Sequence, residues 1–388
     1  MTPSARDLER FIDRDRLTER LRALVRIPSE NPPGEESAVA AAVRWQCEEL
    51  GLDVTEHAFE PGRPSVVARY GSGPPVVGFC SHIDVVPAGD HSLWAHEPYG
   101  AEIEDGRMHG RGSSDAKGPV AAALEAVAAL KQAGIEGSLE LSLVADEETM
   151  GLKGAKPLVE ESVLTAPHVI VGEPTSLRIV RAQRGPCWFR ITTRGVAGHG
   201  SAPERGVNAV RHMAAIILHL EETLPDITHP IVGGPSINVG TIRGGEKVNI
   251  IPASCTVEVD RRTIPGETEE EVRAQVERSI ELAKREFPDI DALVEIPIFG
   301  RPFEIADGAR VLSDVCAAVT DAQGAEAEVI GFRGSSDARF FADAGSEVVV
   351  CGPGDITVAH TAREYIDLDE LHRGAIAYAS AFARLLDA

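Results

Sequence analysis

Histidine and carboxylate side chains recur in short clusters along the 388-residue sequence, most of them directly after an apolar run of strand length. The members of these clusters are His82, Asp84, Asp115, Glu147, Glu148, Glu173 and His360. In open α/β sheets the carboxyl ends of the strands form one edge, and ligands bind there. Five oxygen and nitrogen ligands with a spare carboxylate at one such edge predict a site for two metal ions.

The ligand types indicate the metal. Imidazole and carboxylate without thiolate favour zinc, with Co²⁺ or Mn²⁺ as possible substitutes. Two metals about 3.5–4 Å apart need a bridging carboxylate, and together they polarise a carbonyl and activate a water. Adjacent side chains on an extended segment diverge, so Glu147 and Glu148 can divide the roles of general base and ligand. Asp84 can hold the second ring nitrogen of His82.

Strands and helices alternate around these clusters, which predicts an α/β domain with a largely parallel sheet. Strands are expected at residues 65–70, 75–80, 139–144, 168–171 and 347–351, with helices at 119–130, 311–319 and 369–386. Residues 187–298 instead follow the order β-α-β-β-α-β, which is the ferredoxin-like pattern. We therefore expect one α/β domain in two pieces, residues 1–180 and 299–388, with a smaller domain inserted at 181–298.

The composition excludes some classes of partner. The chain has 38 Lys and Arg against 61 Asp and Glu, which gives a formal net charge of −23. It has no run of basic residues of the kind that binds a nucleic acid or an anionic membrane. Hydrophobic residues make up 43% of the chain, as in a soluble globular protein. The six cysteines are scattered singly, and no signal or membrane-spanning segment is evident, so a reduced, cytoplasmic protein is expected.

Five motifs carry a resemblance to a known family. They are SHIDVVP at 81–87, GRGSSDAKG at 110–118, DEE at 146–148, GEP at 172–174, and GPG at 352–354 followed by His360-Thr361 and Glu364-Tyr365. The chain resembles the M20-like zinc hydrolases that include acetylornithine deacetylase, succinyl-diaminopimelate desuccinylase, aminoacylase and carboxypeptidase G. The resemblance implies a zinc-aminopeptidase-like catalytic domain, a lid and dimerisation domain inserted into it, and two Zn²⁺ per subunit.

The resemblance also implies a role for each cluster residue. Asp115 would bridge the two zinc ions, His82 and Glu173 would complete one site, and Glu148 with His360 would complete the other. Glu147 would be the general base, and Asp84 would orient His82. The peptide bond between Asp115 and Ala116 would be cis.

The inserted domain has a motif of its own, GHGSAP at 198–203. In the family this domain forms a homodimer, and the residue matching His199 reaches the active site of the partner to stabilise an oxyanion. Arg262 matches the family's carboxylate-binding arginine. Asn249, Gly334 and Ser335 are further substrate-contact candidates.

These residues predict hydrolysis of the amide bond in a small N-acyl amino acid. One alternative keeps the chemistry and makes the protein a carboxypeptidase or dipeptidase acting on short peptides. A second alternative is a non-catalytic metal-binding scaffold. Such relatives usually lose a ligand or the base, whereas this sequence retains both.

Overall fold

The computed structural model describes residues 5–387, and the chain divides into two compact units. Unit 1 comprises Met1–Arg181, Ile305–Ile330 and Ser336–Ala388, and unit 2 comprises Ala182–Glu304 and Gly331–Ser335. Unit 2 therefore interrupts unit 1 along the sequence. It also takes in residues 299–304 and 331–335, which the division made from the sequence gave to the larger domain.

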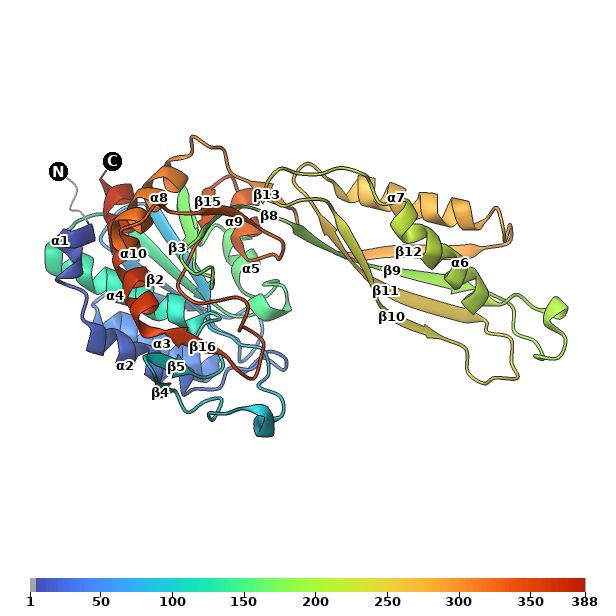
Figure 1. The fold of residues 1–388 in the computed structure, drawn as a ribbon, viewed down its shortest axis with the longest axis horizontal. Helices are drawn as coiled ribbons and strands as arrows, with labels where there is room; N and C mark the ends of the chain where they lie inside the picture. The colour runs from blue at the N-terminus through green and yellow to red at the C-terminus, as the bar shows by residue number, and fades with distance from the viewer. Residues whose placement is uncertain (1–4, 388) are drawn as a thin grey trace. The chain divides into compact units, whose positions relative to one another are not determined.

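A mixed sheet forms the centre of unit 1 (Figure 1). Its strands follow the order β1-β2-β6-β3-β7-β15-β8. Their bounds are β1 Asp53–His57, β2 Ser65–Tyr70, β3 Val77–His82, β6 Leu139–Val144, β7 His168–Val171, β8 Ile179–Gln183 and β15 Glu347–Val350. The four central strands β6, β3, β7 and β15 pair in parallel, and the flanking pairs are antiparallel. Every residue of β3 and β6 is buried, as in strands covered on both faces.

Helices cover this sheet. Their bounds are α1 Ala5–Glu9, α2 Arg14–Val25, α3 Ser37–Glu49, α4 Lys117–Ala133, α5 Ala155–Glu160, α8 Arg310–Gln323, α9 Ala338–Asp343 and α10 Leu368–Leu386. Helix α10 packs against α4, α8 and β3, whereas α9 packs on β15. The Phe79 ring of β3 meets the Tyr378 ring of α10 edge to face, with centroids 5.1 Å apart. This aromatic contact lies in the main apolar core.

A small three-stranded sheet also belongs to unit 1. It consists of β4 Glu102–Glu104, β5 Arg107–His109 and β16 Tyr365–Asp367, in the order β16-β5-β4. Met108 and Ile366 are buried on one of its faces. The strands are too short to give a periodic signal, and the sequence did not predict them. Strand β5 leads directly into the loop that carries Asp115.

Unit 2 is built on a four-stranded antiparallel sheet in the order β10-β11-β9-β12. Its elements are β9 Gly185–Arg194, α6 Ala209–Glu222, β10 Ser236–Gly244, β11 Ser254–Thr263, α7 Glu269–Ala283 and β12 Asp291–Phe299. Both helices lie on one face of the sheet (Figure 1). Buried and half-buried residues alternate from Cys255 to Thr263 in β11, as a sheet with one covered face requires. The predicted β-α-β-β-α-β order is confirmed.

The α/β fold class with an inserted domain is confirmed, and strands β3 and β1 also differ from the prediction. The strand predicted at 75–80 extends to His82, because Ser81 and His82 pair with Leu143 and Val144 of β6. Strand β1 was not predicted, since four of its five residues are polar and none is buried. In the described part of the chain, no helix combines the length and apolarity needed to cross a membrane.

Candidate metal centre

Parallel strands gather the candidate metal ligands, all of which lie in unit 1. His82 ends β3, Glu148 follows β6, and Glu173 follows β7, so neighbouring strands present all three at one sheet edge. Asp115 lies in the loop that precedes α4, and His360 lies in the loop between β15 and β16. Five residues from five segments of the chain thus converge on the carboxyl edge of the sheet.

The Asp115 carboxylate lies between two imidazoles. Its Oδ1 is 3.1 Å from Nε2 of His82, and its Oδ2 is 3.3 Å from Nε2 of His360. Burial raises the pKa of the Asp115 carboxyl, but hydrogen bonds from His360 and His82 outweigh burial and lower it well below its usual range. The peptide bond that follows Asp115 is cis. A carboxylate whose two oxygens face different imidazoles can bridge two cations.

Two more carboxylates complete the cluster. Glu148 Oε2 is 3.1 Å from Nε2 of His360, and one donor atom each from His82, Asp115 and Glu148 lies within 4.8 Å of the others. Glu173 Oε2 is 3.8 Å from Nε2 of His82. Glu173 Oε1 is buried and has no hydrogen-bond partner among the described residues. Leaving such an oxygen unpaired costs free energy, and a bound cation would satisfy it.

The backbone carbonyl and the side-chain carboxylate of Asp84 contact different groups. The His82 Nδ1 atom is 2.9 Å from the backbone carbonyl of Asp84 but 3.6 Å from its carboxylate. The carboxylate instead accepts hydrogen bonds from the backbone N–H groups of Glu147 and Glu148 and from the Asn31 side chain. Asp84 therefore orients His82 through its carbonyl and holds the glutamate turn through its carboxylate.

The turn that carries Glu147 is unusual in its backbone. Asp146 and Met150 flank it with φ angles of 73° and 90°, a region that few non-glycine residues adopt. The Asp146 carboxylate pairs with the buried Arg63 at 2.7 Å and accepts hydrogen bonds from Thr149 and from the backbone N–H of Lys153. These contacts hold the turn. The Glu147 carboxylate has no hydrogen-bond or ion-pair partner among the described residues, so it is available to accept a proton.

The charge balance of the cluster fits cations. Burial raises the pKa of the Glu147, Glu148 and Glu173 carboxyls, and repulsion between neighbouring carboxylates adds to the shift. The buried site therefore holds more carboxylates than its two imidazoles can offset. Oxygen and nitrogen donors with surplus negative charge are what divalent cations of the zinc type require, so the residues present fit a pair of them.

The sequence analysis named Glu364 as a motif residue without a role, and the structure shows what its side chain holds. It is 1% exposed, and its Oε1 accepts hydrogen bonds from the backbone N–H groups of Gly112, Ser114 and Asp115 at 2.9, 3.1 and 3.1 Å. Arg111 forms a buried ion pair with the same carboxylate. Glu364 thus shapes the loop that presents Asp115. No local signal could reveal it, because its partners lie about 250 residues away in the chain.

The other candidates, His199, Asn249, Arg262, Gly334 and Ser335, lie in unit 2. At one end of its sheet, His199 forms a β-bridge with Ile250, and Gly200 donates a hydrogen bond to the backbone carbonyl of Asn249 at 2.9 Å. His199 and Asn249 therefore share two adjacent loops. The His199 Nδ1 atom is 2.7 Å from the hydroxyl of Ser201.

Arg262 and the pair Gly334–Ser335 belong to the opposite end of that sheet. Arg262 pairs with Pro186 near the start of β9, and Arg184 just before it donates its backbone N–H to Phe332. The ten residues of β11 separate this end from the His199 loop, a span of about 30 Å. The Arg262 guanidinium is held by Asp260 at 2.9 Å. Within unit 2, the predicted substrate contacts therefore form two separate groups.

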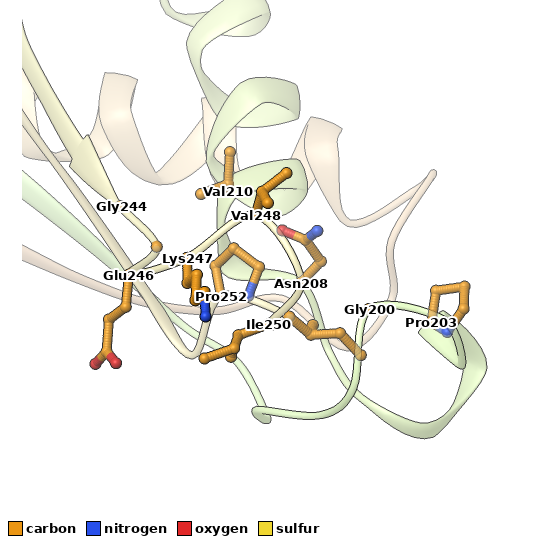
Figure 2. Close-up of a pocket in the computed structure, with 12 residues that line it drawn as sticks. Gly200, Pro203, Asn208, Val210, Gly244, Glu246, Lys247, Val248, Ile250 and Pro252 are labelled. Atoms are coloured by element: carbon orange, nitrogen blue, oxygen red, sulfur yellow. The ribbon is translucent and has the colours of Figure 1, made fainter.

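A cavity of about 550 Å³ adjoins the His199 loop (Figure 2). Residues of the same two loops and the start of α6 line it, among them Gly200, Asn208, Lys247, Val248 and Ile250. Lys247 and Pro252 are among the lining side chains labelled in Figure 2. Val248 is fully exposed. The cavity is open and lies between loops of unit 2.

The chain is similar to a known protein family and to several known proteins. Residues 78–384 match the model of peptidase family M20/M25/M40. The chain is 34% identical over 319 residues to acetylornithine deacetylase of Myxococcus xanthus, covering 81% of each chain. It is 30% identical over 329 residues to succinyl-diaminopimelate desuccinylase of Marinobacter nauticus, covering 82% of this chain and 86% of that one. The solved structure of aminopeptidase PepT from Bacillus cereus superposes with a TM-score of 0.80 at 24% identity, covering 97% and 99% of the two chains.

Proposed function

This chain belongs to peptidase family M20/M25/M40, and on that premise we propose that it is a binuclear zinc deacylase that hydrolyses the amide bond of an N-acyl amino acid. The family consists of metal-dependent hydrolases, and hydrolysis of linear amides is the reaction class of this protein. The finer proposal is supported by its relatives, which include an acetylornithine deacetylase and a succinyl-diaminopimelate desuccinylase.

The observation that carries the proposal is the position of Asp115 between His82 and His360. In the proposed centre Asp115 would hold both zinc ions, His82 and Glu173 would bind the first, and Glu148 and His360 would bind the second. The unpartnered Oε1 of Glu173 supports its assignment as a ligand. When bound, zinc would lower the pKa of a water and polarise the scissile carbonyl.

Glu147 is the proposed general base. Its carboxylate, raised in pKa by burial and by repulsion from Glu173, would accept the proton of the attacking water and pass it to the leaving amine. Asp84 supports this role by holding the backbone of Glu147 and Glu148 at 3.3 and 3.2 Å. The general base and a proposed ligand are therefore fixed by one carboxylate.

The substrate contacts are proposed to come from unit 2. Arg262, with Gly334 and Ser335 at the same end of its sheet, would bind the substrate carboxylate in its own subunit. His199 and Asn249 lie at the other end, about 30 Å away along β11. This separation supports a homodimer in which His199 and Asn249 serve the partner's active site, with His199 stabilising the oxyanion. The cytoplasm is the proposed compartment, supported by six cysteines that form no disulfide.

Exposed apolar side chains support unit 2 as the dimer-forming part. Among the described residues, eight of the fourteen large hydrophobic side chains that are exposed lie in this smaller unit. They are Trp188, Val196, Leu218, Ile227, Ile242, Val248, Ile250 and Leu293. Exposed apolar side chains of this kind are covered when two copies of a domain associate.

A hydrolysis screen tests the proposed reaction. Protein reconstituted with Zn²⁺ or Co²⁺ is assayed for release of a free amino group from N-acetylornithine, N-succinyl-diaminopimelate, N-acyl-glutamates and dipeptides. Cleavage of the N-acyl amino acids in preference to dipeptides is expected. Preference for dipeptides would assign the chain to the peptidase alternative, and no turnover of any substrate in metal-loaded protein would favour the non-catalytic scaffold.

A further inference from the structure

A second group of potential metal ligands lies on the small sheet of unit 1, away from the cluster around Asp115. Strands β4 and β5 form a hairpin in which Glu102 pairs with His109 and Glu104 pairs with Arg107. Because side chains alternate along a strand, these four share one face, while Ile103 and Met108 lie on the other. The hairpin therefore presents two carboxylates and an imidazole on a single polar face.

His96 completes this group from the loop before β4. Its ring stacks on the ring of His109, with centroids 4.0 Å apart and planes inclined by 25°. One donor atom each from His96, Glu104 and His109 lies within 4.8 Å of the other two. The edges of a tetrahedron with bonds of ~2.0–2.1 Å are about 3.3 Å long, so small side-chain rotations would bring the three donors onto one ion.

The two nitrogens of His96 have separate partners. Nδ1 is 3.0 Å from Glu102 Oε2, and Nε2 is 3.4 Å from Glu104 Oε2. A carboxylate that accepts a hydrogen bond from the Nδ1–H group fixes the tautomer and leaves the Nε2 lone pair for a metal, which is the usual environment of a metal-binding histidine. Glu102 therefore has the position of an orienting residue, and Glu104 has that of a ligand.

The second imidazole is suited to the same task. Burial, followed by repulsion from His96, lowers the pKa of His109. Arg107 is a cation on the same polar face. Its guanidinium stacks over the Tyr365 ring, 4.4 Å from the centroid, and is not one of the clustered donor atoms.

We propose that His96, Glu104 and His109 bind a divalent cation of the zinc class, with Glu102 orienting His96. Two imidazoles and one carboxylate are a common zinc donor set, and because Glu104 is exposed, water can fill the remaining position. The ion would link the loop before β4 to β5, the strand that leads to the Asp115 loop. This site is independent of the proposed reaction and could exist in a protein with any substrate.

Metal counting tests the site. Full-length wild-type protein and the double variant His96→Gln/His109→Gln are equilibrated with Zn²⁺ at a series of buffered free concentrations, and bound zinc is measured by mass spectrometry. At saturation the double variant is expected to bind one equivalent less than the wild type. Its hydrolase activity and circular dichroism should match the wild type, because neither histidine belongs to the candidate centre around Asp115.

Two further variants separate a built site from adventitious binding. His91→Gln removes an exposed histidine in the same loop region and should leave the zinc count unchanged. Glu102→Gln should keep the equivalent but weaken its affinity roughly 10–100-fold, the usual effect of losing an orienting carboxylate. This variant also tests the site if the double variant fails to fold. Equal zinc binding by the wild type and the double variant at every concentration would overturn the proposal, as would an equal loss in His91→Gln.

Discussion

At the scale of single residues, the candidate centre depends on carboxylates that differ in what holds them. Asp115 is pinned on both oxygens by imidazoles, whereas Glu147 has no partner in the described part of the chain. Asp84 is held by three hydrogen bonds, and it orients His82 through its carbonyl. The same functional group therefore supplies a candidate bridge, a candidate base and a positioning group, and its surroundings decide which role each carboxylate has.

Replacing the candidate base tests this division. Glu147→Gln keeps the size of the side chain and removes its ability to accept a proton, so kcat is expected to fall about 10²–10⁴-fold. Both metal equivalents of the centre should remain, because Glu147 is not a proposed ligand. Steady-state kinetics and metal analysis on the same preparation measure the two effects. Glu161→Gln, which alters an exposed glutamate at the end of α5, is the control, and near-wild-type turnover in Glu147→Gln would rule out the base.

Asp337 offers a pH-dependent prediction. It is 1% exposed, and neither carboxylate oxygen has a hydrogen-bond partner among the described residues, although the Arg339 guanidinium is 4.0 Å from Oδ1. Burial outweighs the attraction of Arg339 and raises the pKa of Asp337 to about 6. The folded state therefore binds this proton more tightly than the unfolded state, whose pKa is about 3.9. The free energy of unfolding should fall as the pH rises from about 4 to about 6, with a total loss of about 3 kcal/mol that persists at higher pH.

The isosteric variant Asp337→Asn should lack this loss. In metal-free protein, urea unfolding is expected to give similar stability for both proteins near pH 4 and a more stable variant above about pH 6. A difference that does not change with pH would show that the carboxyl group titrates normally.

At the scale of elements, a buried carboxylate joins helices α2 and α4. Glu125 of α4 is fully buried, accepts a hydrogen bond from the backbone of Asp13, and pairs with Arg16 and Arg20 of α2. Arg20 is itself only 6% exposed. The contact fixes the start of α2 against the middle of α4, the helix that follows the Asp115 loop.

Removing Glu125 should therefore destabilise the fold. Glu125→Ala leaves the buried Arg20 with only the more distant Glu49 carboxylate, 3.8 Å away, and a loss of about 3–5 kcal/mol in the free energy of unfolding is expected. Arg14→Ala is the matched control, since its ion pair with Asp369 is exposed and should contribute within about 0.5 kcal/mol. Urea denaturation monitored by circular dichroism compares them. Equal stability of the two variants would contradict the structural role of Glu125.

At the scale of the whole molecule, the candidate functional residues are distributed over two units. Unit 1 contains the candidate metal centre, and unit 2 contains the candidate substrate contacts, in two groups at the ends of one sheet. A single copy of unit 2 cannot bring His199 and Arg262 together, because β11 runs between them. In the proposed dimer, Arg262 and His199 at one active site would come from different subunits. The assignment of residues 181–298 as a lid and dimerisation domain stays a prediction.

The dimer can be tested at an exposed apolar position of unit 2. Leu218 on α6 is 78% exposed, and Leu218→Glu is expected to convert a dimer of twice 41.3 kDa into monomers with reduced turnover, since His199 would no longer reach a partner. Leu93→Glu alters a similarly exposed leucine of unit 1 and should leave the dimer intact. Light scattering coupled to gel filtration measures the mass, and a monomeric wild-type protein would exclude the role proposed for His199.

Much of the fold and the candidate ligand set could be read from local pattern. Apolar runs of strand length were followed by His82, Glu148 and Glu173, and parallel strands necessarily bring such positions to one edge. Where the pattern was short or polar, prediction failed: β1, β4 and β5 have too few apolar residues to give a period. The extension of β3 to His82 was likewise decided by pairing with β6.

The sequence by itself determined which chemical groups are available, the α/β class and the inserted β-α-β-β-α-β unit, because these depend on residue type and on short-range periodicity. The tertiary structure decided how the groups are held: Glu364 behind the Asp115 loop, Arg63 behind the Glu147 turn, and Glu125 between α2 and α4. Each of these contacts joins segments far apart in the chain. Breaking one of these pairs would leave a buried charge without a partner, which is strongly unfavourable, and no local pattern of residues records that cost.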